Sequence, residues 1–174
     1  MIVRPATPAD APALVVLINQ AYRGPAAPQA WTTEAHLLDG PRISEEHLRE
    51  MTTAATHSRP AVLLKYADER GTIQGCVYLE PQGEALYLST LAVAPEAPGQ
   101  GVGRQLLAAA EDYARQHGCT HVEISVLSAR PELVAWYERH GYQRTGHSEP
   151  FPDGLDFGQP RQPLVLLKLE KQID

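Results

Sequence analysis

The spacing of hydrophobic residues changes several times along the chain and predicts an alternation of strands and helices. A short strand is expected at Ile2–Arg4. Thr7–Asp10 has the composition of a helix-capping box, with a proline at the first helical position. Apolar residues then recur at helical spacing as far as Ala21, and a second helix is expected to start at Ser44 and to end before Pro60.

The middle of the chain has the alternation and the turn residues of antiparallel strands. Ala61–Ala67 and Ile73–Leu79 are predicted to form a hairpin, with Ala85–Ala94 as a third strand. An amphipathic helix over 102–117 then leads to a strand over 120–127. Because a helix connects them, the strands on either side of it should be parallel.

In the last third of the chain, the sequence predicts a shorter helix and shorter strands. Pro131 opens a helix that Gly141 ends, and Tyr142–Thr145 and Leu164–Leu169 are predicted as the closing strands. The segment 146–163 is polar and rich in proline, and we expect it to be a loop near the functional site.

Taken together, these elements predict an α/β fold in a single domain over 1–174. Its mixed sheet should hold about six or seven strands, mostly antiparallel, flanked by about four helices.

The segment Ala97–Arg104, Ala-Pro-Gly-Gln-Gly-Val-Gly-Arg, lies between a predicted strand and a predicted helix. Glycines let a phosphate approach the backbone, and a helix N-terminus contributes roughly half a positive charge. No Lys follows Gly103, which excludes a Walker loop, and Arg104 stands where a dinucleotide fingerprint needs its last glycine. A glycine-rich turn without a ligand is the alternative interpretation.

The glycine pattern after Leu-Ala-Val resembles the pyrophosphate loop of the GNAT superfamily of N-acetyltransferases. Leu133–Tyr142 resembles the second signature of that superfamily, a helix end with an aromatic residue, Tyr-Glu and Gly. The resemblance implies a sheet with a splayed central parallel pair and acetyl-CoA as co-substrate. It also implies transfer of acetyl to an amine of a small molecule or peptide, by direct attack in a ternary complex. A cofactor-binding regulatory or interaction module of the same fold, without turnover, is the alternative.

The resemblance also assigns cofactor-binding residues. Two positions depart from the family pattern: Pro98 stands in place of Arg or Gln, and Arg130 in place of Asn. Pro98 offers neither a guanidinium nor an N–H, and Arg104 could partly replace the lost charge. The assigned residues are Leu91, Ala92, Val93, Gly99, Gln100, Gly101, Val102, Gly103, Arg104 and Arg130.

The resemblance places proton delivery on Tyr137, which would protonate the departing thiolate. A phenol of pKa about 10 facing a thiol of pKa about 8.5 makes this transfer uphill by roughly 2 kcal/mol at most. A buried core tyrosine is the alternative interpretation. Glu84 is the first candidate for the base that accepts the amine proton, with Glu80 and Glu123 as alternatives, and each could instead be a solvated charge at a strand end.

Candidate acceptor-binding residues come from two segments that wall the acceptor site in this family. Trp31 and Glu34 lie in the first, with Arg42 beyond them, and Phe151 lies in the second. Aromatic rings and a carboxylate suit a cationic or amphipathic amine. Packing of a long loop by Trp31 is the alternative.

Composition and charge limit the classes of partner that we expect for this chain. The net charge of −6 and the absence of a basic run argue against nucleic acid. No signal-like start or long apolar run is present, so we expect a cytoplasmic protein without a membrane partner. Cys76 and Cys119 lack partners at ligand spacing and are interpreted as reduced core thiols, so no metal site is expected. A homodimer is one option for assembly.

Overall fold

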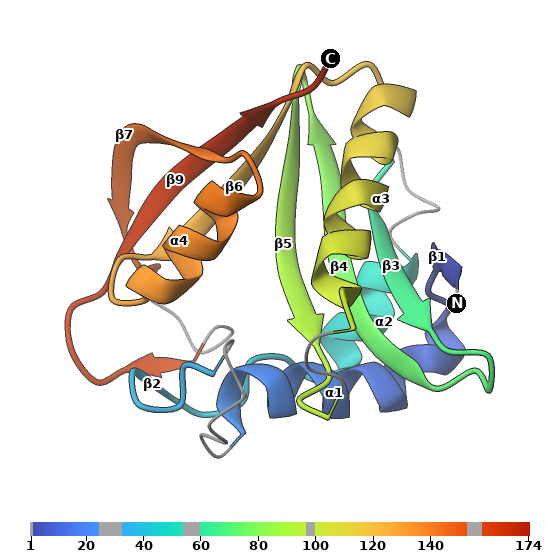
Figure 1. Cartoon of the computed structure of the whole chain (residues 1–174). Coiled ribbons are helices and arrows are strands. Elements are labelled where there is room, and N and C mark those ends of the chain that lie inside the picture. Colours follow the sequence, from blue (N-terminus) through green and yellow to red (C-terminus); the bar gives the residue numbers. More distant parts are fainter. Residues whose placement is uncertain (1, 25–32, 54–59, 97–99, 153–157) are drawn as a thin grey trace.

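A seven-stranded sheet forms the centre of the computed structural model, with helices on both of its faces (Figure 1). The strand order is β1-β3-β4-β5-β6-β9-β7. The structure describes residues 2–24, 33–53, 60–96, 100–152 and 158–174. The strands are β1 (Ile2–Pro5), β3 (Val62–Ala67), β4 (Ile73–Gln82), β5 (Ala85–Val93), β6 (His121–Leu127), β7 (Gln143–Pro150) and β9 (Val165–Gln172).

Two pairs of helices cover the sheet and bury separate cores. α1 (Ala11–Arg23) and α2 (Glu45–Thr53) pack on one face. α3 (Val102–Gln116) and α4 (Pro131–Arg139) pack on the other. Within the described ranges, none of these helices is both long and apolar enough to cross a membrane. The observed fold confirms the predicted class.

The predicted capping box is present at the start of the first helix. The Thr7 backbone N–H donates a 2.8 Å hydrogen bond to the Asp10 carboxylate, and a 3₁₀ turn over Pro8–Asp10 leads into α1. The other oxygen of that carboxylate pairs with Lys65 of β3 at 2.5 Å. The local cap therefore also fixes α1 against the sheet.

The predicted parallel pair is confirmed, and it is short. β5 pairs with β6 only over Ala85–Tyr87 and His121–Glu123. β5 then continues along β4, whereas β6 continues along β9. Figure 1 shows the two strands separating as they leave this shared end. The sheet therefore consists of two lobes joined by one short ladder.

The described parts of 146–163, which are residues 146–152 and 158–163, contain strands instead of only the loop that the composition predicts. β7 runs on to Pro150, and β8 (Gln159–Pro160) pairs with β2 (Leu38–Asp39) in a separate two-stranded sheet. β7 is an edge strand that pairs only with β9, and nearly all its residues are exposed. Its start overlaps the strand predicted over Tyr142–Thr145, but because its later residues bury little, they show no apolar alternation that would extend the prediction.

Close packing of α3 on the sheet depends on Gly75 in β4. A Cβ at Gly75 would lie 2.8 Å from Val102 Cγ1 and 2.9 Å from the Ala92 carbonyl oxygen. The second atom belongs to the backbone of β5 and cannot rotate away. The absent side chain therefore lets the first turn of α3 lie directly against β4 and β5.

We expect Gly75→Ala to lower the free energy of unfolding by about 1–3 kcal/mol, because overpacking forces α3 away from the sheet. Urea denaturation measures this change. As a control, Gly83→Ala also acts at a glycine, with φ of 65°, but meets no neighbouring atom within 4 Å. Gly83→Ala should lose stability through backbone strain alone. An unchanged stability of Gly75→Ala would contradict the packing argument.

Candidate active site

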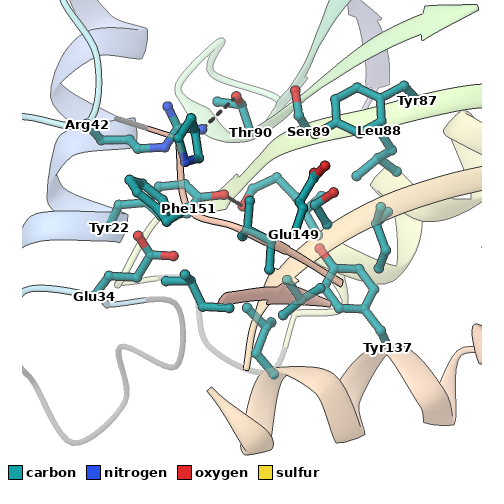
Figure 2. Close-up of a pocket in the computed structure, with 18 of the residues that line it drawn as sticks. Tyr22, Glu34, Arg42, Tyr87, Leu88, Ser89, Thr90, Tyr137, Glu149 and Phe151 are labelled. Atoms are coloured by element: carbon teal, nitrogen blue, oxygen red, sulfur yellow. Dashed lines mark hydrogen bonds between the residues drawn. The ribbon is translucent and has the colours of Figure 1, made fainter. Parts of the chain in front are cut away.

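A pocket of about 360 Å³ lies where β5 and β6 diverge (Figure 2). Its walls come from the end of α1, the segment that follows it, β5, β6, α4 and the end of β7. Because the strands have separated here, Leu88–Leu91 of β5 face the pocket instead of a neighbouring strand. The pocket thus combines main-chain groups of β5 with side chains from both helical layers.

A β-bulge in β5 shapes one wall of this pocket. The register between β4 and β5 shifts between Cys76 and Tyr78, opposite Thr90. Thr90 is buried and has a left-handed conformation, with φ of 51°, which no other non-glycine residue adopts in the ranges the structure describes. Such a conformation costs roughly 1–2 kcal/mol for an L-residue, so surrounding contacts must hold it.

Tyr22 and Arg42 supply contacts at this bulge. The Tyr22 hydroxyl donates a 2.8 Å hydrogen bond to the Leu91 carbonyl oxygen. Burial raises the pKa of Tyr22, so the phenol stays protonated and remains a donor. The Arg42 guanidinium lies over the Tyr22 ring, 5.3 Å from its centroid, and its Nη2 is 3.5 Å from the Thr90 hydroxyl oxygen.

The glycine segment ends at the N-terminus of α3. Gly101 is the N-cap residue, with φ of 71°, and its carbonyl oxygen accepts a 3.0 Å hydrogen bond from the Gln105 N–H. A Cβ at Gly101 would lie 3.6 Å from Arg104 Nη2, so this guanidinium lies beside the loop. The first-turn N–H groups of the helix and this charge together suit a phosphate.

The structure places the other predicted cofactor residues as follows. Leu91 lines the pocket, whereas Ala92 and Val93 continue β5 towards the glycine segment with buried side chains. Val102 and Gly103 are buried and Gln100 is exposed. Gly99, like the predicted acceptor residue Trp31, lies outside the described residues.

Arg130 occupies a position that the resemblance did not suggest. Its side chain is almost fully buried at the N-cap of α4, and its Nε donates a 2.5 Å hydrogen bond to Glu132. Partial burial raises the pKa of Glu132, but the hydrogen bond and charge of Arg130 outweigh it and hold the pKa below its ordinary value. Arg130 is not among the pocket-lining residues and anchors the start of the helix that carries Tyr137.

Tyr137 lines the pocket from α4, and only 6% of its surface is exposed. Its ring makes edge contacts with Trp136 and Tyr142, at centroid distances of 5.0 and 5.4 Å. Burial, with smaller contributions from Tyr22 and Tyr142, raises the pKa of Tyr137 well above its ordinary value. The phenol therefore retains its proton at neutral pH and can give it only to a strongly basic atom.

The structure does not bring Glu84 to the pocket. Glu84 lies in the exposed turn between β4 and β5, at the opposite end of β5 from Leu91. Glu80 and Glu123 likewise do not line the pocket. The signal that suggested Glu84 was its position at the head of β5, but the site forms at the other end of that strand.

Two predicted acceptor residues do line the pocket. Glu34 forms an ion pair with Arg23 at 2.8 Å, and both side chains are largely buried. Phe151 lines the pocket just after the end of β7. The pairing neutralises Glu34, so this carboxylate is less suited to a cationic acceptor than its sequence position suggested.

Glu149 is the carboxylate that sequence reasoning did not single out. It lies near the end of β7, is about half exposed, and has Lys168 at 3.9 Å. Figure 2 shows it in the middle of the pocket, with Phe151 on one side and Tyr137 on the other. Its segment was expected to be a wall of the site, but without the β7–β9 register nothing indicated which side chain faces inward.

Comparison with known proteins places the chain in a family. The profile of the Acetyltransferase (GNAT) family matches residues 26–142. Over 149 residues the chain is 30% identical to the uncharacterized N-acetyltransferase YhfO of Bacillus subtilis, covering 82% of this chain and 90% of that protein. The chain belongs to the GNAT family.

Two further proteins resemble the chain, one over part of its sequence and the other over its whole fold. The chain is 36% identical over 69 residues to acetyltransferase Atu2258 of Agrobacterium fabrum, covering 40% of this chain and about half (49%) of that relative. The structure of yncA from Salmonella typhimurium, solved with its cofactor acetyl-CoA, has a TM-score of 0.69 at 22% identity. It covers 100% of this chain and 94% of that one. GNAT proteins use acetyl-CoA as co-substrate, as the residues of the glycine segment imply.

We expect Gly101→Val to weaken acetyl-CoA binding by about tenfold or more, because a branched side chain blocks close approach of a phosphate to the backbone. Isothermal titration with acetyl-CoA measures the affinity. Gly118→Val is the matched control, since Gly118 lies after the other end of α3 with a similar φ of 69°. It should carry the same backbone strain and retain the affinity of the unmodified protein.

Proposed function

We propose that this protein transfers an acetyl group from acetyl-CoA to a primary amine of a small molecule or peptide, by direct attack within a ternary complex. One observation carries the proposal: the unpaired edge of β5 at its bulge and the phenol of Tyr137 line the same pocket. The first can hold and polarise a thioester, and the second can protonate its leaving group.

The divergence of β5 from β6 supports the binding part of this proposal. The pantetheine chain is extended and amide-bearing, so it can pair with the free edge of β5 as an added strand. The glycine segment follows β5 directly, which brings a phosphate site to the end of the same path. Main-chain N–H groups near the bulge would polarise the thioester carbonyl.

The chemical step balances with the residues of the pocket. The amine lone pair attacks the acetyl carbon, the carbon–sulfur bond breaks, and the Tyr137 proton passes to the thiolate sulfur. The proton that the attacking nitrogen loses as the amide forms returns to the Tyr137 phenolate, so the phenol is restored. The raised pKa of Tyr137 makes this transfer less favourable than for an exposed phenol. The same dry surroundings raise the pKa of the departing thiol, which offsets part of that difference.

Glu149 is our candidate for the group that accepts the amine proton. An alkylamine of pKa about 10.4 is neutral in only about one part in a thousand at pH 7.4, so deprotonation costs roughly 4 kcal/mol. Glu149 is the pocket carboxylate without a close ion pair, since Glu34 is bound to Arg23 and Lys168 is 3.9 Å from Glu149. Its partial exposure lets the proton leave to solvent.

The cysteines support direct attack over an acetyl-cysteine intermediate. Cys76 is fully buried behind the bulge, with its Sγ 3.9 Å from the Thr90 carbonyl oxygen, and burial raises its pKa to about 12. Burial also raises the pKa of Cys119. Neither thiol lines the pocket, so neither offers a thiolate to a thioester there.

We expect Tyr137→Phe to lower kcat about 100-fold while acetyl-CoA affinity and the melting temperature change little, because only the acidic oxygen is removed. The loss should shrink at low pH, where solvent supplies the proton. Thiol release with a panel of amines, measured with the melting temperature on one sample, tests this.

Tyr142→Phe is the matched control for that experiment. Its ring contacts Tyr137, but its buried hydroxyl has no hydrogen-bond partner in the described structure and does not line the pocket. It should retain kcat and lose no stability. Acetyl-CoA binding without acceptor-dependent thiol release in the unmodified protein would favour the alternative of a binding module without turnover.

We expect Glu149→Gln to lower kcat/KM for the amine by about tenfold or more at pH 7, with partial recovery at higher pH, where more amine is neutral. Initial rates across a pH series provide the measurement. Glu84→Gln serves as the control, because it removes the same charge outside the pocket. A loss confined to Glu84→Gln would overturn the assignment of the base.

A further inference from the structure

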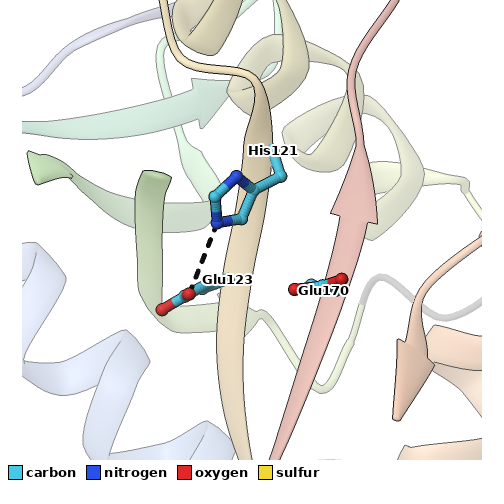
Figure 3. A group of neighbouring side chains, drawn as sticks. All are labelled: His121, Glu123 and Glu170. Atoms are coloured by element: carbon cyan, nitrogen blue, oxygen red, sulfur yellow. Dashed lines mark hydrogen bonds and ion pairs between the residues drawn. The ribbon is translucent and has the colours of Figure 1, made fainter. Parts of the chain in front are cut away.

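A second group of polar side chains lies outside the candidate active site, on the face of β6 and β9 opposite the one packed against α3 and α4. His121 and Glu123 are two residues apart on β6 and share a face, and Glu170 of β9 is the register partner of Glu123 (Figure 3). One donor atom from each side chain lies within 4.8 Å of the other two. All three side chains are partly buried.

The Thr120 hydroxyl lies behind His121. Its oxygen is 3.0 Å from His121 Nδ1 and 3.3 Å from the Glu84 carbonyl oxygen. When the hydroxyl donates to that carbonyl, it can accept the proton of Nδ1, and the neutral ring then presents the lone pair of Nε2 to Glu123, whose Oε1 is 3.4 Å away. This is the tautomer that can bind a metal ion through Nε2.

A cation between His121 Nε2 and Glu123 Oε1 would find a lone pair on each side, whereas without one Nε2 can carry a proton and donate it to Glu123. In the part of the chain that the structure describes, neither Glu123 nor Glu170 forms an ion pair with Lys or Arg. Glu170 is contacted instead by the Gln172 amide, at a long 3.4 Å. The cluster thus brings together two carboxylates and an imidazole nitrogen with little positive charge to balance them.

The shortest spacing in the cluster, between His121 and Glu123, fits a metal ion better than an ammonium group. Ligands about 2.0–2.1 Å from a tetrahedral zinc ion lie about 3.4 Å apart, which matches the separation of His121 Nε2 and Glu123 Oε1. Acceptors around an ammonium, with hydrogen bonds of about 2.8 Å, lie about 4.6 Å apart. Imidazole with carboxylates is also a zinc ligand set, whereas Ca²⁺ and Mg²⁺ prefer oxygen alone.

We propose that His121, Glu123 and Glu170 form a Zn²⁺ site with three protein ligands and a water as the fourth. Thr120 is a positioning residue that orients the imidazole from behind. The ion would join β6 to β9, the two strands that carry the lobe on the far side of the divergence. The sequence did not suggest a metal because the ligands lie on strands far apart in the chain. The site is independent of the proposed acetyl transfer.

The test uses the full chain, stripped with a chelator and free of any polyhistidine tag, titrated with Zn²⁺ in a calorimeter. We expect one Zn²⁺ per chain and a raised melting temperature. His121→Ala, Glu123→Gln and Glu170→Gln should each weaken binding at least about tenfold, and Thr120→Val about 10- to 100-fold. Glu80→Gln is the control. Glu80 pairs with Tyr87 across the sheet, and Tyr87 pairs with Glu123, so Glu80 lies in the same row of residues but two strands away from the cluster.

Three outcomes would overturn the proposal. One is an unmodified protein that binds no Zn²⁺ at millimolar concentration. The second is binding that survives all four substitutions, which would place the ion elsewhere. The third is a set of variants that change only the KM of a diamine acceptor, which would make the cluster a site for a second ammonium group. Unaltered acetyl-CoA binding in every variant keeps this test separate from the proposed acetyl transfer.

Discussion

Every part of the candidate active site depends on the separation of β5 from β6 after three residue pairs. Pairing with β6 ends at Tyr87, and the left-handed Thr90 and the bulge around it lie in the part of β5 beyond that point. The hydrogen bond from Tyr22 to Leu91 ties the turned segment to α1. Without this separation the edge of β5 would be hydrogen-bonded to β6, and Tyr137 would face a continuous sheet instead of a pocket.

Three buried tyrosines around the site show how partners give similar groups different roles. Burial raises the pKa of Tyr22, Tyr137 and Tyr142 alike. Tyr22 uses its hydroxyl to hold a backbone carbonyl, and the Tyr142 hydroxyl has no partner among the described residues. Tyr22 and Tyr137 both line the pocket, but only the Tyr22 hydroxyl is held by β5, and among the described residues no hydrogen bond holds the Tyr137 hydroxyl. Placement, more than acidity, separates a candidate acid from a structural tyrosine.

The sequence predicted those parts of the candidate site that rest on local signals. The glycine segment and the helix end around Tyr137 are contiguous motifs, and their described residues, from Gln100 onward and in α4, lie in the elements that the pattern predicted. The position of Glu149 depends on the register of an edge strand whose exposed residues leave no alternation to read. Glu84 looked equally suitable because the sequence does not reveal at which end of β5 the site forms.

Arg130 and the His121 cluster illustrate a second limit. Arg130 is buried through its pairing with Glu132 and the packing of α4, and a charged residue gives no sign of such burial in the sequence. The cluster on β6 and β9 requires two strands to be aligned residue by residue. Tertiary packing decides the first and strand register decides the second, and no single segment encodes either.

The free edge of β5 also affects how this chain can change over evolutionary time. Recognition through main-chain N–H and C=O groups does not depend on which side chain a residue carries, provided the strand keeps its shape. The substitutions tolerated along Leu88–Val93 are therefore those that keep the packing and the backbone geometry of the strand, whatever the chemistry of the bound molecule. Under the proposed function, most side chains of the strand and of the acceptor walls can therefore change separately, while the same main-chain path still binds acetyl-CoA.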